Sequence, residues 1–260
     1  MKPIKKIMMV LSVVLCLILG IAGCSSGDNA NKSEEIGKTE QNTESAKEDI
    51  VIRLAGGDTG LPNPFKHYAR GPGISKMQLL YDSLIEKDER STIPWLAESW
   101  ETGADGTTYT FKLQSNVLWH DGQKMTAEDV KFTFEYYKDH PPVSNELMIN
   151  GKYIIQSVEV LDEQTVRLTV DAPNATYFAK IGFARILPKH IWEKVDDPVK
   201  FVGEGRTIGC GPYVMEEYNP QQGIYRFKAF DKYWGPKQKV AAIEWVPVSD
   251  PVLAFENGER

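Results

Sequence analysis

Two adjacent residues, His120 and Asp121, have the chemical types of a general acid–base pair. Adjacent side chains on a turn point apart, however, and no nucleophile with a local signature accompanies them. We therefore interpret residues 119–122 as a tight turn that leads into a capped helix. The neighbouring carboxylates Glu128 and Asp129 are ordinary partners of the positive end of a helix dipole. The sequence thus predicts no catalytic residue and no enzyme.

The cysteines and histidines do not form a metal-binding pattern. Cys16 and Cys24 lie near the amino terminus, which leaves Cys210 alone in the expected folded part, where it can form no disulfide. We expect Cys210 to pack as a small apolar residue. The four histidines lie far apart, without the spacing of metal ligands. The glycine-rich stretch at 56–60 lacks the lysine and serine of a phosphate-binding loop, so we expect neither a metal nor a cofactor.

The charge balance is acidic, with a formal net charge of −6. The first 23 residues carry three lysines and no acidic residue, so the remainder is more negative still. An acidic protein is poorly suited to bind nucleic acid or an anionic lipid surface, and we expect no nucleic-acid partner.

The amino terminus has the layout of a secretory signal peptide. Three lysines precede residues 7–22, which carry no charge. This run of about 16 residues is shorter than the roughly 20 that a membrane-spanning helix needs. It ends in Ile-Ala-Gly before Cys24, which resembles the bacterial lipobox. The resemblance implies that residues 1–23 are removed and that Cys24 carries a diacylglycerol; the alternatives are an ordinary signal peptide or an uncleaved anchor.

Residues 24–49 differ sharply in composition from the residues after position 49. Their only large aliphatic residue is Ile36, so this stretch cannot bury enough apolar surface to offset its chain entropy. We expect a disordered tether that connects the lipid to a folded part beginning at Ile50. The roughly 210 residues after the tether could form one large or two small domains.

Hydrophobic periodicity predicts a mixed α+β fold. Strands are expected at 50–54 (a short buried strand), 108–113, 157–161, 165–170, 213–217, 224–230 and 240–248. Helices are expected from about 74 to 87, from 127 to 138, at 175–184, after Pro188 and at 250–257. Residues 55–73 contain too many glycines and prolines for either element, and long loops of this kind are often functional.

Ten short segments, taken together, resemble the extracellular solute-binding proteins of family 5, which serve ABC importers of peptides, oligopeptides and nickel. They are NPF at 63–65, YDSL at 81–84, PWLAESW at 94–100, GTTYTFKL at 106–113, VLWHDG at 117–122, TAEDV at 126–130, ILPKH at 186–190, GCGPY at 209–213, YWG at 233–235 and NGE at 257–259. Their shared order carries the resemblance, since each segment alone is weakly specific.

The resemblance implies a two-lobed α/β fold of the periplasmic-binding-protein type II class, of which only the amino-terminal part is present. It divides the chain into a first segment of the ligand-facing lobe at 50–85, a side domain at 86–201 and a return segment at 202–260. Family members continue for about as long again, so we expect the second lobe to be missing. A truncated receptor of this kind would bind weakly, because a specific pocket buries most of its ligand.

The resemblance also implies a function. It is that of a substrate-binding lipoprotein of an ABC importer for peptides or related solutes, nickel complexes included. The expected protein is a monomer, held by Cys24 at the extracytoplasmic face of the cell membrane, with permease subunits as partners. The alternative is a sensor or signalling lipoprotein that uses the same fold to present its ligand to a membrane partner.

The resemblance moves attention from the His120–Asp121 turn to the loop at 56–73. There, Asp58 could meet a ligand amine, whereas His67, Tyr68 and Arg70 could meet carbonyls, a carboxylate or a metal chelate. The alternative is that the loop only packs between lobes, with Arg70 paired internally.

Overall fold

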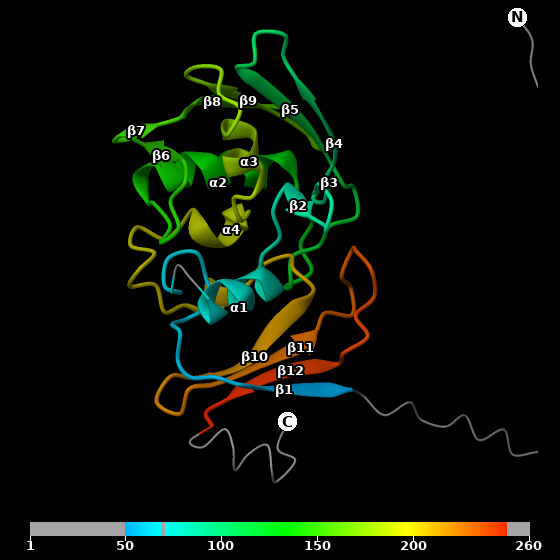
Figure 1. Ribbon diagram of the computed structural model, residues 1–260, viewed down its shortest axis with the longest axis vertical. Coiled ribbons are helices and arrows are strands. Elements are labelled where there is room, and N and C mark those ends of the chain that lie inside the picture. Colours follow the sequence, from blue (N-terminus) through cyan, green and yellow to red (C-terminus); the bar gives the residue numbers. More distant parts are fainter. Residues whose placement is uncertain (1–49, 69–70, 249–260) are drawn as a thin grey trace, which may run out of the picture. The chain divides into compact units, whose positions relative to one another are not determined.

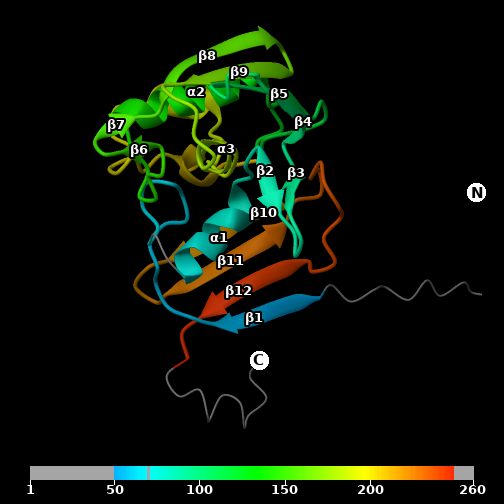
Figure 2. The same cartoon turned by 45° about the horizontal axis from the view of Figure 1, so that its top comes forward.

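The computed structural model describes residues 50–68 and 71–248. Its first sheet has the strand order β1 (Val51–Ala55), β12 (Ala242–Val246), β11 (Ile224–Ala229) and β10 (Tyr213–Asn219). Strands β1 and β12 are parallel, whereas β11 is antiparallel to both of its neighbours, β10 and β12. Figure 2 shows the four strands side by side, from β1 in blue to β10 in orange, with helix α1 (Pro72–Leu80) beside them.

The second sheet is antiparallel throughout, in the order β4 (Ala97–Thr102), β5 (Thr108–Leu113), β9 (Thr165–Val170) and β8 (Ile155–Asp162). Helix α2 (Ala127–Asp139) packs against β8 and β9 (Figure 1). The remaining elements are short: β2 (Ile85–Lys87), β3 (Thr92–Pro94), β6 (Met148–Ile149), β7 (Lys152–Tyr153), α3 (Tyr177–Gly182), α4 (Lys189–Trp192) and the 3-10 helix η1 (Glu204–Thr207).

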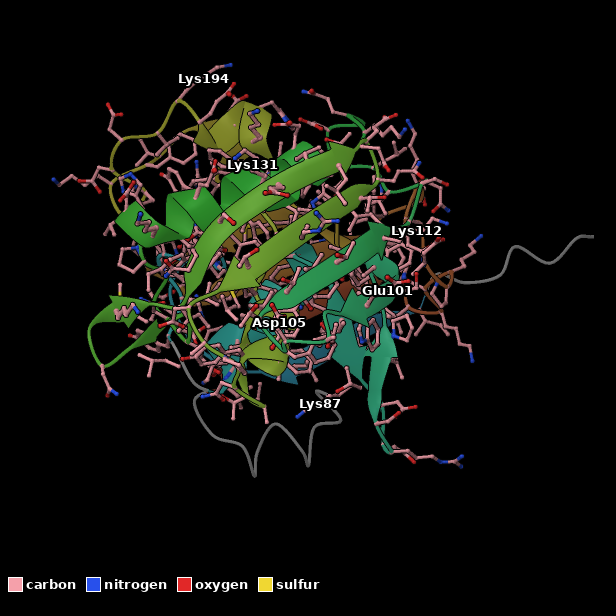
Figure 3. All side chains as sticks on the ribbon, turned by 90° about the horizontal axis from the view of Figure 1, so that it is seen from above. Lys87, Glu101, Asp105, Lys112, Lys131 and Lys194 are labelled. Carbon is pink, nitrogen blue, oxygen red and sulfur yellow. The ribbon has the colours of Figure 1, made fainter. Side chains whose placement is uncertain are left out.

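Alternation along β5 explains how the second sheet covers its core. Tyr109, Phe111 and Leu113 are buried, whereas Lys112 points outward. Seen from above, Lys112 and Glu101 of β4 lie among the charged side chains on the outer surface (Figure 3). Period-two alternation of this kind is typical of a strand with one buried face.

The predicted capped helix is confirmed as α2. The Asp129 carboxylate accepts a hydrogen bond from the Thr126 backbone N–H at 2.8 Å, which satisfies a donor at the helix start. Glu128 and Asp129 lie in the first turn, where they complement the helix dipole. The predicted hairpin at 157–170 and the strands near 213, 224 and 242 are also confirmed, within a few residues.

The helix predicted for 74–87 is wrong beyond Leu80. At Tyr81 the backbone becomes extended, with φ −123° and ψ 124°. The following residues bond to distant segments instead of continuing a helix: Ser83 forms a bridge with Arg185, and the Leu84 carbonyl accepts from the Ala97 N–H at 2.9 Å. The apolar residues after Leu80 would be buried either in a longer helix or in the extended segment that forms instead. Tertiary contacts therefore override their helical spacing.

The predicted first strand exists as β1, but it is not buried. Its only neighbour among the described residues is β12, and Ile52 and Leu54 are each 39% exposed. The expected signal peptide and tether at 1–49, residue Arg70 and the helix predicted for 250–257 lie outside the described residues. Within the described ranges, no helix has the length and apolar character needed to cross a membrane.

Strands of the first sheet come from both ends of the described chain, and those of the second sheet come from its middle. We retain the domain boundaries at 85 and 201 as a proposal. Cys210 is completely buried, as expected for a small apolar residue.

Candidate functional site

The loop between β1 and α1 is held in shape by its own hydrogen bonds. Gly60 has φ +86°, and a side chain there would meet the Lys66 carbonyl oxygen at 2.2 Å, so only glycine fits. The Asn63 side chain donates to the Arg206 carbonyl at 3.1 Å and accepts from the Phe65 N–H at 3.0 Å. These contacts fix the position of a residue further along the loop, His67.

His67 is the most deeply buried of the predicted ligand residues that the structure describes, with 2% of its surface exposed. Its Nδ1 lies 2.7 Å from the Asn63 carbonyl oxygen. A carbonyl can only accept, so we assign the proton to Nδ1. Burial lowers the pKa of His67, although the bond to Asn63 partly opposes this effect. The ring is therefore neutral near pH 7, and its Nε2 has no hydrogen-bond partner among the described residues.

His67 lines a cavity of about 540 Å³, a volume within the range of small-molecule sites. Four segments form its wall: the loop at 64–67, the face of α1 with Met77, the stretch at 142–147, and the stretch at 180–185. Glu86 and Lys87 of β2 complete it. The cavity therefore unites residues that lie up to about 120 positions apart in the sequence.

Most charges around the cavity are paired. Arg185 forms an ion pair with Glu86 at 2.7 Å, and Lys180 forms one with Glu146 at 3.3 Å. The Lys87 ammonium lies 5.3 Å from the centre of the Phe183 ring and has no carboxylate partner among the described residues. The wall thus combines apolar surface with many polar and charged side chains, most of the charged ones already paired.

Asp58 does not line this cavity, because its carboxylate joins a cluster with two tyrosines. Its Oδ1 accepts hydrogen bonds from Tyr225 at 2.6 Å, from Tyr218 at 3.0 Å and from the Gly60 N–H at 3.1 Å. Burial alone would raise the pKa of Asp58, but these hydrogen bonds outweigh it and the pKa lies below its usual value. Asp58 is ionised at neutral pH and is exposed, so an amine can still reach it.

Lys76 belongs to the same cluster and was missed from the sequence. Its ammonium lies 3.9 Å from the centre of the Tyr225 ring and donates to Thr59 Oγ1 at 3.0 Å. Burial lowers its pKa to about 8, and the charge of Asp58 partly opposes this shift. Lys76 lies three residues after Gly73 and four before Leu80, both of which are buried. This helical spacing places Lys76 on the buried face of α1, and it is the feature of the sequence that could have identified the residue.

The other two predicted ligand residues are not brought to the cavity. Tyr68 is 61% exposed and is not part of the cavity wall. Arg70 lies outside the described residues. In the described part of the chain, no group of three or more histidine, cysteine, aspartate or glutamate residues is arranged to hold a metal ion.

A family model for bacterial extracellular solute-binding proteins, family 5 (middle), matches residues 91–260. The chain belongs to this family. Family 5 consists of solute-binding proteins and not of enzymes. The fold class expected from the sequence, a two-lobed α/β fold of the periplasmic-binding-protein type II class, is therefore confirmed for the part that is present.

Three family 5 relatives illustrate the range of ligands. The dipeptide-binding protein of Escherichia coli (strain K12) is 34% identical over 204 residues, which are 70% of this chain and 37% of that protein. The oligopeptide-binding protein AppA of Bacillus subtilis, solved in complex with a nonapeptide, is 25% identical with a TM-score of 0.67, covering 81% of this chain and 42% of that chain. NikZ of Campylobacter jejuni, solved in complex with Ni(L-His), is 27% identical with a TM-score of 0.65, and the coverage is again 81% and 42%.

The family 5 chain described here thus spans about two fifths of the length of these relatives.

Proposed function

We propose that this chain is a substrate-binding lipoprotein of an ABC importer for peptides or related solutes. Membership of family 5 supports the solute-binding role, and the names of the dipeptide- and oligopeptide-binding relatives support the ligand class. Nickel complexes form a second ligand class, which the bound Ni(L-His) of the Campylobacter relative favours.

The observation that carries the proposal is the cavity of about 540 Å³ beneath the loop at 64–67. The loop, helix α1 and the stretches at 142–147 and 180–185 converge on it, and one of its lining residues is His67, whose Nε2 is buried and unpaired among the described residues. A concave cavity of this volume, with apolar surface and polar groups that converge on it, is a usual form of a small-ligand site.

The protein would act at the extracytoplasmic face of the membrane as a monomer, held by lipid on Cys24 and the tether at 24–49. Its partners would be the permease subunits that receive the solute. Residues 1–260 span about two fifths of these relatives, and we also propose that this span by itself binds more weakly than the relatives do.

Calorimetric titration of the purified chain tests this function. The injected probes are alanine di-, tri- and tetrapeptides and, separately, the nickel(II)–histidine complex. We expect saturable binding of at least one peptide, with a Kd weaker than micromolar. Micromolar or tighter binding would contradict the proposed weakness, and the absence of binding by every probe would contradict the function.

A further inference from the structure

The hydrogen bond from Nδ1 of His67 leaves the other ring nitrogen, Nε2, as an acceptor for a ligand. Because Nδ1–H donates to the Asn63 carbonyl at 2.7 Å, the neutral ring presents a lone pair at Nε2. Donation from Nε2 to a ligand carbonyl or carboxylate would need a second proton on the ring. Burial opposes that proton, since it lowers the pKa of His67. Of the roles expected from the sequence, the two that need a donor are therefore excluded.

An unpaired acceptor in this position destabilises the ligand-free protein. A buried polar atom without a partner is unfavourable, because it has lost its hydrogen bond to water and gained none in return. Nε2 of His67 and, in its assigned orientation, Oδ1 of Asn145 are both buried atoms without partners in the described structure. Both residues line the same cavity, and both atoms are acceptors. These two acceptors of the cavity wall therefore lack hydrogen-bond donors.

A metal ion could also use the lone pair, but the surroundings favour a donor. Among the residues that the structure describes, His67 belongs to no group of three or more acidic, cysteine or histidine side chains that could hold an ion. A metal would have to bring most of its own ligands. A ligand N–H group can donate a hydrogen bond to the lone pair without any further ligand from the protein. The second free acceptor, on Asn145, can accept a hydrogen bond from an N–H group in the same way.

We propose that His67 is a specificity-determining residue whose Nε2 accepts a hydrogen bond from an amide or ammonium N–H of the ligand. The inference rests on the proposed function, because it takes the cavity to be the ligand site. Less than 1 Å² of Nε2 is accessible, so the wall must adjust when the donor enters. Met77 lies in the same wall, and an unbranched methionine side chain can change rotamer easily.

The test compares the wild-type chain with His67→Leu, and His190→Leu serves as the matched control because His190 lies outside the cavity wall. The probes are the alanine di-, tri- and tetrapeptides and analogues that lack one N–H group. Amides are replaced by esters in turn, and the terminal ammonium is trimethylated. Affinities are measured by NMR titration, which detects millimolar binding.

We expect His67→Leu to weaken peptide binding about tenfold and His190→Leu to leave it unchanged. One analogue should lose a similar factor against the wild type but nothing further against His67→Leu, because the same bond is already absent. If His67→Leu does not fold, the analogues still test the bond on the wild-type chain.

Four results would overturn the inference. Peptides that bind equally well to His67→Leu would show that His67 is not used, while the proposed function would stand. If every analogue binds the wild type as tightly as the unmodified peptide does, this would likewise show that the hydrogen bond to His67 is not used. Nickel(II)–histidine binding that needs His67, without any dependence of peptide binding on it, would assign the lone pair to a metal. If the wild-type chain binds the nickel(II)–histidine complex but no peptide, the inference is also overturned; if it binds no probe at all, the proposed function itself fails.

Discussion

His120 donates a hydrogen bond from Nε2 to the backbone carbonyl of Gly211, at 3.0 Å. Its Nδ1 accepts from the Gly209 N–H at 3.2 Å. The imidazole thus joins the turn before α2 to a backbone segment about 90 residues later. His120 does not pair with its neighbour Asp121, whose Oδ2 lies instead 2.7 Å from Nε2 of His190. The adjacent pair is structural, as interpreted from the sequence.

We predict that His120→Ala lowers the free energy of unfolding by about 2–4 kcal/mol, because two backbone groups of the 209–211 segment lose their partner. His190→Ala is the matched control, since it removes only a surface pair with Asp121 and should cost less than about 1 kcal/mol. Urea denaturation measures both. Equal losses in the two variants would mean that the bonds of His120 contribute little.

Between pH 4 and pH 6.5, the titrations of His120 and Asp82 should change the free energy of unfolding in opposite directions. Burial lowers the pKa of His120 to about 4, so the unfolded chain binds a proton first and stability falls as the pH drops. Burial raises the pKa of Asp82 to about 6, although hydrogen bonds from Tyr233 and Trp234 oppose the shift. The folded protein then binds that proton first, so this group adds stability as the pH drops from about 6.

We therefore predict that Asp82→Asn makes the loss of stability between pH 6 and pH 4 steeper, by on the order of 3 kcal/mol over the window. The measurement is urea denaturation of both proteins at several pH values. Parallel pH profiles for the variant and the wild type would show that Asp82 has an ordinary pKa.

Gly209 should tolerate no side chain. A Cβ atom there would lie 1.9 Å from the Leu80 carbonyl oxygen, which is backbone and cannot move aside without disturbing the end of α1. We expect Gly209→Ala to destabilise by more than about 3 kcal/mol or to prevent folding. At Gly57 nothing lies within 4 Å, so Gly57→Ala should be neutral or stabilising by up to about 1 kcal/mol. A folded Gly209→Ala protein with unchanged stability would contradict the close approach.

The Tyr225 hydroxyl should control the order of the loop after β1. It accepts from the Thr59 N–H at 2.7 Å and also donates to Asp58, whereas the Tyr218 hydroxyl donates to Asp58 alone among the described residues. Tyr225→Phe should therefore speed hydrogen exchange at the Thr59 amide about tenfold, and Tyr218→Phe should leave it nearly unchanged. Similar exchange rates in both variants would show that the Thr59 amide is protected by something else.

The proposed lipid anchor on Cys24 predicts a change of location in a variant. Cys24→Ala removes the only sulfur that the lipobox resemblance offers for lipid attachment, so the protein should move from the membrane fraction to the medium. Immunoblotting of fractions from a lipoprotein-producing bacterium measures this. Retention of Cys24→Ala in the membrane would favour the uncleaved anchor that the sequence left open.

Local patterns predicted much of the fold, because alternation and capping depend on neighbouring residues. The buried face of β5 and the start of α2 at Thr126 followed directly from them. The end of α1 at Leu80 did not follow from a local pattern. The spacing of the apolar residues Tyr81 and Leu84 is compatible both with a longer helix and with the buried extended segment that the structure shows.

The site was predictable only in part. His67 and Asp58 were expected from their residue types in a long loop, and the structure places them in two different environments. Much of the remaining cavity wall comes from residues 142–147 and 180–185, which no local pattern brings near His67. Lys76 was missed because a buried lysine is rare, and its aromatic partner Tyr225 is about 150 positions away.

Binding of a solute in the cavity beside His67 can be tested by mapping the NMR signals of this chain during titration with alanine peptides. We expect saturable shifts that gather at His67, Met77 and Asn145, with little change at the Asp58 cluster. Shifts that gather elsewhere, or signals that stay unchanged to millimolar peptide, would contradict a ligand site in this cavity.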